Sequence, residues 1–280
     1  MFELTKDVAK FFVDRAQSAY VTAAKAVGYI DFPVPPNSNM RRTSSAWIKH
    51  YHDSGIRTGL PIATGAMLAG LDFASPLKAL DFGAGVGRQV RYFQKHHPDV
   101  SLFACDVEKS HMDWMAKAYP QVHSYQNSYL PPLKYEDRFF DLVYSVSIFS
   151  HISEEHAALW LQEFARVVRP GGIACLTVLG WNAHRMGEPK DDERHTAMLQ
   201  EGHFHEKYAF IPDAKRRAEK RTIFKNTQMV SNCDESYGVT YYTPKYVQSR
   251  WASNEWEIFG ISEGTIDNLQ DLIVLRRTGQ

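Results

Sequence analysis

Short apolar segments alternate with amphipathic ones between residues 77 and 179, and this alternation restricts the chain to very few folds. The pattern predicts strands at 77–82, 101–106, 122–125, 140–146 and 172–179, with helices at 87–96, at 108–118 and over the segment HAALWLQEFARVV. The strands are apolar along their whole length, as expected for a parallel sheet with helices on both faces. We therefore expect a doubly wound α/β fold.

The flanking segments extend this core at both ends. Before it, the spacing predicts a helix over 5–27, a Pro-rich linker at 31–39 and short helices at 43–53 and 59–71; after it, a helix at 244–253 and strands at 256–261 and 271–277. We expect seven strands, the last antiparallel. The predicted organisation is an N-terminal helical extension or cofactor lid (1–74) and a main domain (75–280). Within that domain, 181–235 is too long for an ordinary connection and predicts an inserted lid or substrate-pocket segment.

Charge and cysteine content narrow the possible functions. The 280 residues carry 32 basic and 32 acidic side chains, and this zero net charge disfavours a nucleic-acid partner bound by phosphate neutralisation. The three cysteines are far apart and form no CxxC motif, which indicates a reduced, intracellular protein. No apolar run approaches the roughly 20 residues of a membrane span, and the N-terminus lacks a signal-peptide pattern. We expect a cytoplasmic protein without a membrane partner, and leave a homo-oligomer open.

A glycine-rich turn, LDFGAGVGR at 80–88, follows the first predicted strand. Its glycines, Gly83, Gly85 and Gly87, permit a tight turn and let a ligand approach the backbone. The carboxyl ends of parallel strands are also where such sheets bind ligands. Arg88 stands where a dinucleotide fingerprint has its third glycine, which disfavours a nicotinamide cofactor. No Gly-Lys-Ser/Thr follows, so the turn is not a Walker A loop.

The glycine turn and its flanks resemble the class I S-adenosylmethionine-dependent methyltransferases. The further motifs are Asp106 ending the second strand, Asn127-Ser128 after the third, FDLVYSVSIFSHI at 140–152, and RVVRPGGIACLTV at 166–178. The resemblance covers about 75–180 well and 240–277 loosely. It implies S-adenosylmethionine as cofactor and release of S-adenosylhomocysteine. The segments SVSIFSHIS and QDLIVLR also resemble a bacterial branch that acts on small molecules.

The resemblance assigns roles to individual side chains. Asp81 would contact the methionine end of the cofactor, Asp106 the ribose hydroxyls, and Asn127 the adenine, although many relatives carry Asp there. The expected cofactor-binding residues are Tyr51, Asp81, Gly83, Ala84, Gly85, Gly87, Arg88, Asp106, Val107, Asn127, Ser128, Ser145 and Val146. Tyr51 could instead be a core aromatic residue, and Arg88 a surface residue. The sequence YSVSIF is not the Asn/Asp-Pro-Pro-Tyr motif of enzymes that methylate adenine N6.

His151 is the candidate general base, because histidine titrates near neutral pH and follows the fourth strand. It could instead cap the helix that begins near Ser153, or pack against the cofactor. The histidines between 195 and 205 match no zinc spacing, so we expect no metal. The basic run KRRAEKRTIFK at 215–225 is either a solvated helix face or a binding site for an anionic group.

Together these features predict a methyltransferase acting on the oxygen, nitrogen or carbon of a small-molecule acceptor. Three alternatives remain at this point: a nucleic-acid methyltransferase, a nicotinamide oxidoreductase, and a methyltransferase-like protein that acts as a scaffold.

Overall fold

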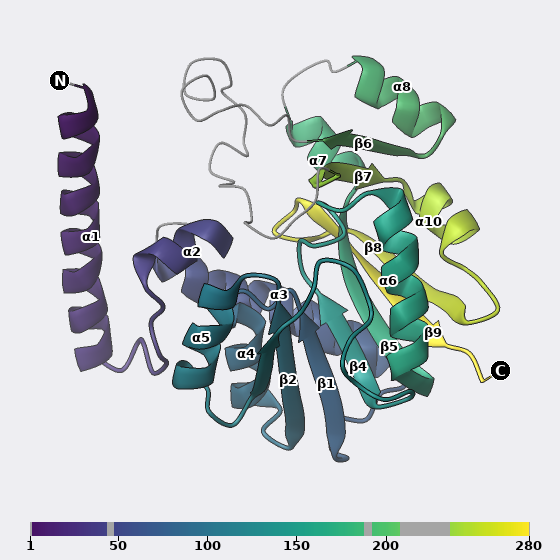
Figure 1. Cartoon of the computed structure of the whole chain (residues 1–280), viewed down its shortest axis with the longest axis horizontal. Helices are drawn as coiled ribbons and strands as arrows, with labels where there is room; N and C mark the ends of the chain where they lie inside the picture. Colours follow the sequence, from purple (N-terminus) through teal and green to yellow (C-terminus); the bar gives the residue numbers. More distant parts are fainter. Residues whose placement is uncertain (1, 44–47, 188–191, 208–235, 280) are drawn as a thin grey trace.

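Five parallel strands form the centre of the sheet in the computed structural model, which describes residues 2–43, 48–187, 192–207 and 236–279 (Figure 1). The strands are β1 (Leu77–Phe82), β2 (Val100–Asp106), β3 (His123–Gln126), β4 (Phe140–Ser145) and β5 (Val168–Leu179), in the order β3-β2-β1-β4-β5. β9 (Gln270–Arg277) pairs antiparallel with β5, and β8 (Trp256–Ile266) pairs antiparallel with β9. This topology confirms the doubly wound fold and the antiparallel last strand.

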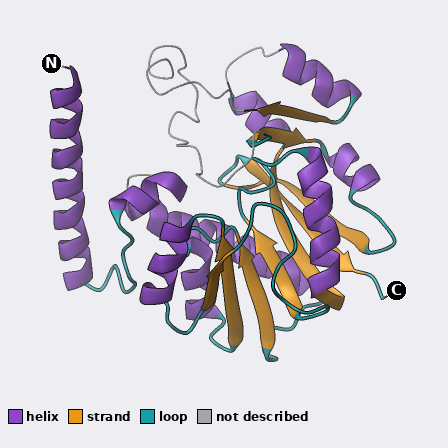
Figure 2. Ribbon diagram, viewed as in Figure 1, coloured by secondary structure: helices purple, strands orange, loops and turns teal. Residues whose placement is uncertain are grey.

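Helices cover both faces of the sheet, which explains why its central strands are apolar throughout (Figure 2). One face packs against α3 (Ile48–Leu68), α4 (Arg88–His96) and α5 (Lys109–Ala118), the other against α6 (Glu154–Val167) and α10 (Pro244–Arg250). Phe93 and Tyr144 stack in the first layer, and Phe82 meets Trp160 in the second. Because β1 contributes to both layers, its carboxyl end is fixed from both sides.

The N-terminal extension differs from the prediction. It consists of α1 (Phe2–Ala26), α2 (Asn37–Thr43) and the single long helix α3. The helices predicted at 43–53 and 59–71 are therefore largely one helix, and the break between them was wrong, as was a linker reaching residue 39. α3 continues through Pro61, although proline removes one helical hydrogen bond. Ile62 and Ala66 are fully buried against the sheet, and this burial keeps the helix intact across the proline.

The segment after β5 adds two strands to the seven predicted. It contains α7 (Trp181–Met186), α8 (Asp192–Gln200) and β6 (His203–Lys207), and β6 pairs antiparallel with β7 (Gly238–Tyr242). β7 joins the main sheet beside β5 through Leu179 and Tyr241. In Figure 1 these elements lie together beyond the carboxyl end of β5. The basic run at 215–225 lies outside the described residues.

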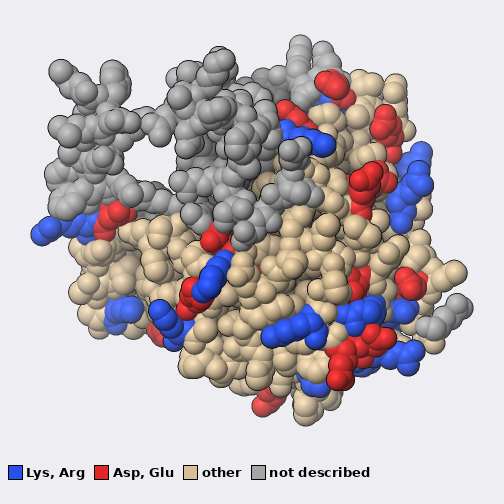
Figure 3. Space-filling model, in the orientation of Figure 1, with Lys and Arg blue, Asp and Glu red and all other residues tan. Residues whose placement is uncertain are grey.

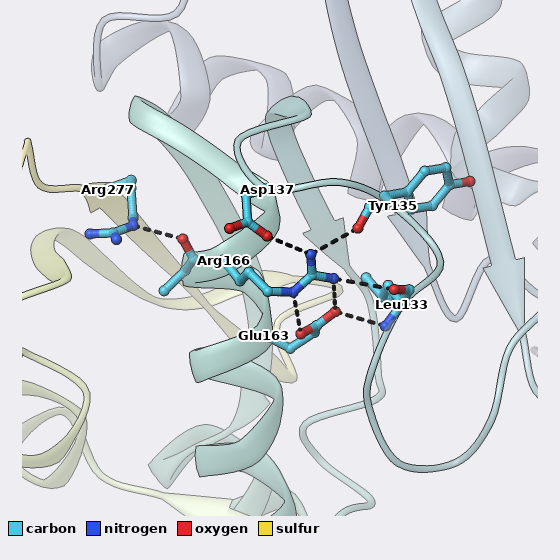
Figure 4. Close-up of polar contacts among 7 residues, drawn as sticks. Leu133, Tyr135, Asp137, Glu163, Arg166 and Arg277 are labelled. Atoms are coloured by element: carbon cyan, nitrogen blue, oxygen red, sulfur yellow. Dashed lines mark hydrogen bonds and ion pairs between the residues drawn. The ribbon is translucent and has the colours of Figure 1, made fainter.

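Arg166 fastens the loop before β4 to α6 (Figure 4). Its guanidinium donates to both carboxylate oxygens of Glu163, to Asp137 and to the carbonyls of Leu133 and Tyr135. Glu163 is almost buried and also accepts the Leu133 amide at 2.7 Å. A buried carboxylate is tolerated here because each of its oxygens has a hydrogen-bond donor.

The described surface carries mixed charge. On the face shown in Figure 3, Lys and Arg side chains alternate with Asp and Glu instead of gathering into one basic area. Among the described residues, no helix is long and apolar enough to cross a membrane. Cys105 and Cys175 are buried free thiols, and burial raises the pKa of Cys175 to about 12.

Candidate active site

The glycine turn between β1 and α4 depends on backbone angles that favour glycine. Gly83, Gly85 and Gly87 have φ values of 74°, 54° and 82°. The amides of Gly83 and Ala84 donate to the Cys105 carbonyl at 2.9 and 3.0 Å, which ties the turn to β2. A Cβ on Gly85 would lie 2.7 Å from Cγ2 of Thr43, so α2 covers the turn closely. Sequence reasoning missed Thr43, because no local pattern links it to a turn forty residues later.

Asp106 is held at the carboxyl end of β2 by backbone amides. Its Oδ2 accepts the Gly85 amide at 2.9 Å and its Oδ1 accepts the Glu108 amide at 2.8 Å. A carboxylate can accept about four hydrogen bonds. The remaining capacity suits the ribose hydroxyls expected here. His111 is almost buried, with Nδ1 3.4 Å from Asp106 Oδ1, and is a further site residue that the sequence analysis did not identify.

Asp81 is buried near the carboxyl end of β1. It is 1% exposed and lies beside the Tyr144 hydroxyl, but neither carboxylate oxygen makes a hydrogen bond of ordinary geometry within the described residues. Burial raises the pKa of Asp81 to about 8, the positive charge of Arg88 opposes this rise, and the negative charge of Asp106 adds to it. A buried carboxyl group of this kind favours a cationic ligand, because the ligand would supply the missing charge.

Tyr51 and Arg88 approach the same turn from α3 and α4. Tyr51 is fully buried and its hydroxyl donates to the Val86 carbonyl at 2.8 Å, so it supports the backbone of the turn. Arg88 is partly exposed at the first position of α4, and burial lowers its pKa while the charges of Tyr51 and Asp81 oppose that shift. Contacts of these two side chains with the cofactor stay predictions.

The remaining predicted cofactor residues lie at the ends of β2, β3 and β4. The Asn127 amide hydrogen bonds to the Asp106 carbonyl at 3.1 Å, so the end of β3 lies beside the end of β2. Val107 and Asn127 are partly buried, and Ser128 is exposed. Ser145 and Val146 are buried at the end of β4. The fold thus brings all four strand ends to one edge, as predicted.

Several buried polar atoms at this edge lack a hydrogen bond of ordinary geometry. Within the described residues, Oδ1 of Asn127, Oγ of Ser145 and both ring nitrogens of His111 make no hydrogen bond, like the carboxylate of Asp81. Such groups are costly unless something else satisfies them. A ligand with an ammonium group, hydroxyls and a heteroaromatic base matches this set, and S-adenosylmethionine has all three. The residues present therefore fit that cofactor.

His151 lies beyond the end of β4 and hydrogen bonds through Nδ1 to the Gly238 carbonyl at 2.9 Å. A carbonyl only accepts, so Nδ1 carries the hydrogen and Nε2 is the basic nitrogen of the neutral ring. Burial lowers the pKa of His151, and the Gly238 bond opposes this shift. Ser153 itself caps α6 by accepting the His156 amide, so His151 is not needed as the cap. Its role as base stays a prediction.

The other histidines singled out by the sequence lie in separate contacts. His195 stacks on His184, His203 pairs with Glu154 at 3.1 Å, and His205 faces Thr240. Among the described residues, no group of three or more His, Cys, Asp or Glu side chains is placed to hold a metal ion.

Comparisons with known proteins indicate a methyltransferase domain. Residues 79–172 match a family model described as a methyltransferase domain. The chain is 27% identical over 127 residues to Methyltransferase str2 of Strobilurus tenacellus, which covers 45% of this chain and 44% of that protein. It is 32% identical over 117 residues to an uncharacterized methyltransferase of Mycolicibacterium gilvum, covering 40% of this chain and 44% of that protein. The matched part of the chain therefore spans less than half the length of these curated relatives.

Among solved structures, an S-adenosylmethionine-dependent methyltransferase from Methanosarcina mazei superposes with a TM-score of 0.52 at 15% identity. The match covers 79% of this chain and 98% of that chain, and it supports the fold. Residues 79–172 are thus similar to a methyltransferase domain, and with the glycine turn, Asp81 and Asp106 these matches support the class I methyltransferase family, whose cofactor is S-adenosylmethionine.

Proposed function

We propose that this protein transfers a methyl group from S-adenosylmethionine to a small-molecule acceptor in the cytoplasm and releases S-adenosylhomocysteine. The observation that carries the proposal is the pair of carboxylates beside the glycine turn. Asp106 is fixed by two backbone amides, and Asp81 is buried beside Tyr144 with neither carboxylate oxygen in a hydrogen bond of ordinary geometry within the described residues. When bound, the cofactor supplies a methyl group that its sulfonium has already activated.

The chain's own residues would bind and align the reactants. Asp106 would accept the ribose hydroxyls, and Asp81 the ammonium group at the methionine end. Because the methyl group is already activated, holding the acceptor in line with it would provide much of the rate. His151 would take the acceptor proton at Nε2 if the acceptor must lose one, since its lowered pKa keeps the ring neutral near pH 7.

Two features support a small acceptor. The net charge is zero, and the face shown in Figure 3 mixes both signs of charge, which offers little attraction to a phosphate backbone. The site is also covered: Thr43 of α2 lies on the glycine turn, and the segment after β5 begins at the same edge of the sheet. We propose that the extension and residues 181–235 close over the reactants and exclude water.

A thermal melt tests the cofactor class first. S-adenosylmethionine or S-adenosylhomocysteine at 100 times its dissociation constant should stabilise the protein by about 2.7 kcal/mol. At roughly 2–4 °C per kcal/mol, the melting temperature rises clearly. A nicotinamide dinucleotide should give no shift. No shift with either methionine-derived ligand, in a folded sample free of copurified cofactor, would refute the proposal.

An acceptor screen then tests turnover. The His151→Gln variant should lose activity toward acceptors that must be deprotonated, while cofactor binding is kept. His123→Gln is the matched control, because His123 is exposed on β3 away from the β4 end. Methylation of RNA or DNA, with binding that weakens steeply as salt rises, would instead identify a nucleic-acid methyltransferase. Cofactor binding without any methylated product would favour a scaffold.

A further inference from the structure

Three side chains from distant parts of the sequence form a closed ring of hydrogen bonds next to the candidate site. The Ser147 amide donates to Thr177 Oγ1 at 2.8 Å, the Thr177 hydroxyl donates to Gln270 Oε1 at 2.6 Å, and Gln270 Nε2 donates to Ser147 Oγ at 2.7 Å. Ser147 follows β4, Thr177 is in β5 and Gln270 begins β9. The ring therefore joins three elements at the carboxyl edge of the sheet.

The ring holds Ser147 in an unusual backbone conformation. Its φ is 62°, in the left-handed region that residues with a Cβ rarely adopt. Such a conformation persists only where the surrounding structure imposes it, and it clusters at ligand sites. Thr177 is fully buried, so its hydroxyl has no solvent alternative to these bonds. Without the ring, Ser147 would relax toward ordinary angles and the next residue would move.

That next residue, Ile148, packs directly against the glycine turn. A Cβ on Gly83 would overlap the Ile148 side chain, so this side chain occupies the space that the glycine leaves. Gly83 is two residues from Asp81, the buried carboxylate assigned to the methionine end of the cofactor. Ile148 thus lies against the turn near Asp81, and because it follows Ser147 directly, its position depends on the conformation of Ser147.

We propose that Thr177 and Gln270 are positioning residues for the cofactor's methionine end. Through Ser147 they hold Ile148 against Gly83, and so set the shape of the pocket where the methyl-bearing sulfur lies. This inference rests on the proposed function, since it needs the cofactor to bind at this turn. The adenosine end, held by Asp106 on β2, is independent of the ring.

Two ligands separate this role from general support of the fold. S-adenosylhomocysteine contains both ends of the cofactor, and adenosine lacks the methionine end. In Thr177→Val, the ring loses its hydroxyl with little change in volume. We expect the Kd for S-adenosylhomocysteine to rise about tenfold, the equivalent of about one lost hydrogen bond. The Kd for adenosine should stay within about twofold, because that half of the site is unchanged.

The conservative variant Thr177→Ser keeps the hydroxyl and should restore binding of S-adenosylhomocysteine. Gln270→Met provides a second break at a partly exposed position: it keeps the length of the side chain but can neither accept from Thr177 nor donate to Ser147. It replaces Thr177→Val in the comparison if that variant fails to fold, as judged by circular dichroism. We expect the same selective loss.

Two results overturn the inference while leaving the proposed function standing. One is an unchanged Kd for S-adenosylhomocysteine in the folded variants. The other is an equal loss of affinity for both ligands, which would indicate a structural role alone. If the wild-type protein binds neither S-adenosylhomocysteine nor S-adenosylmethionine, the proposed function itself has failed, and this inference fails with it.

Discussion

Binding of S-adenosylhomocysteine should depend strongly on pH through Asp81. The pKa of this buried carboxyl group is raised to about 8, so the free protein holds it mostly protonated at neutral pH. A bound ammonium group stabilises the ionised form instead. Binding therefore requires the loss of a proton from Asp81, and it must weaken as the pH falls.

The expected size of the effect follows from that pKa. With a value of about 8, about one molecule in ten carries ionised Asp81 at pH 7.0 and about one in three hundred at pH 5.5. The Kd for S-adenosylhomocysteine should therefore rise about 30-fold between these pH values, equivalent to about 2 kcal/mol. The ligand's own amino group is that of a free amino acid, which is more basic than a chain terminus, so it stays protonated over this range.

Isothermal titration calorimetry in buffers of different ionisation enthalpy measures both the Kd and the number of protons released on binding. At pH 7.0, about nine in ten molecules of the free protein hold Asp81 protonated, so about 0.9 proton should be released per ligand bound. The Asp81→Asn variant should bind more weakly and lose the pH dependence. Adenosine, which has no ammonium group, should bind the wild-type protein with little change between pH 7.0 and 5.5. A flat Kd and no proton release would show that Asp81 is already ionised in the free protein, and would refute this reasoning.

Three further outcomes are expected. Gly85→Ala should weaken S-adenosylhomocysteine binding and destabilise the fold by about 1–2 kcal/mol in thermal melts, because the φ of Gly85 is 54° and the new Cβ would meet Thr43. Adding Thr43→Ser should recover only the part of this loss that comes from the clash with Thr43. Glu163→Gln should lower the melting temperature by several degrees, a loss of about 1–2 kcal/mol, since Arg166 loses the more buried of its two charged partners; an unchanged melt would contradict the role assigned to this cluster. The pKa of Asp271 is raised to about 6 by burial, so its contribution to stability is present at low pH and is lost as pH rises through 6. Between pH 7 and pH 5, the wild-type protein should therefore gain about 1 kcal/mol relative to Asp271→Asn in urea unfolding, and parallel pH profiles of the two proteins would argue against it.

Local sequence patterns were sufficient for the core of this fold. The apolar period predicted each of the five central strands and their helices to within a few residues, because each element signals its own burial. Asp81 and Asp106 could be identified as site residues for a similar reason. Both end apolar strands, and parallel strands place their carboxyl ends at one edge.

The extension was predicted less well, since its helices depend on packing against the rest of the molecule. The sequence analysis placed a break at 54–58, but α3 continues through these residues and through Pro61, because its side chains are buried against the rest of the molecule. β6 and β7 carried only a weak strand signal, and their pairing with each other and with β5 joins residues about 35 and 60 positions apart. Pairing over such distances leaves no periodic trace in a short segment.

The sequence by itself determined the class of fold, the glycine turn and the acidic residues that end β1 and β2. Only the tertiary structure showed that Thr43 lies over Gly85, that His111 stands beside Asp106, and that Thr177 and Gln270 hold Ser147. The physical reason is that a strand or turn is encoded by neighbouring residues, whereas these contacts join side chains whose proximity arises only when the layers pack.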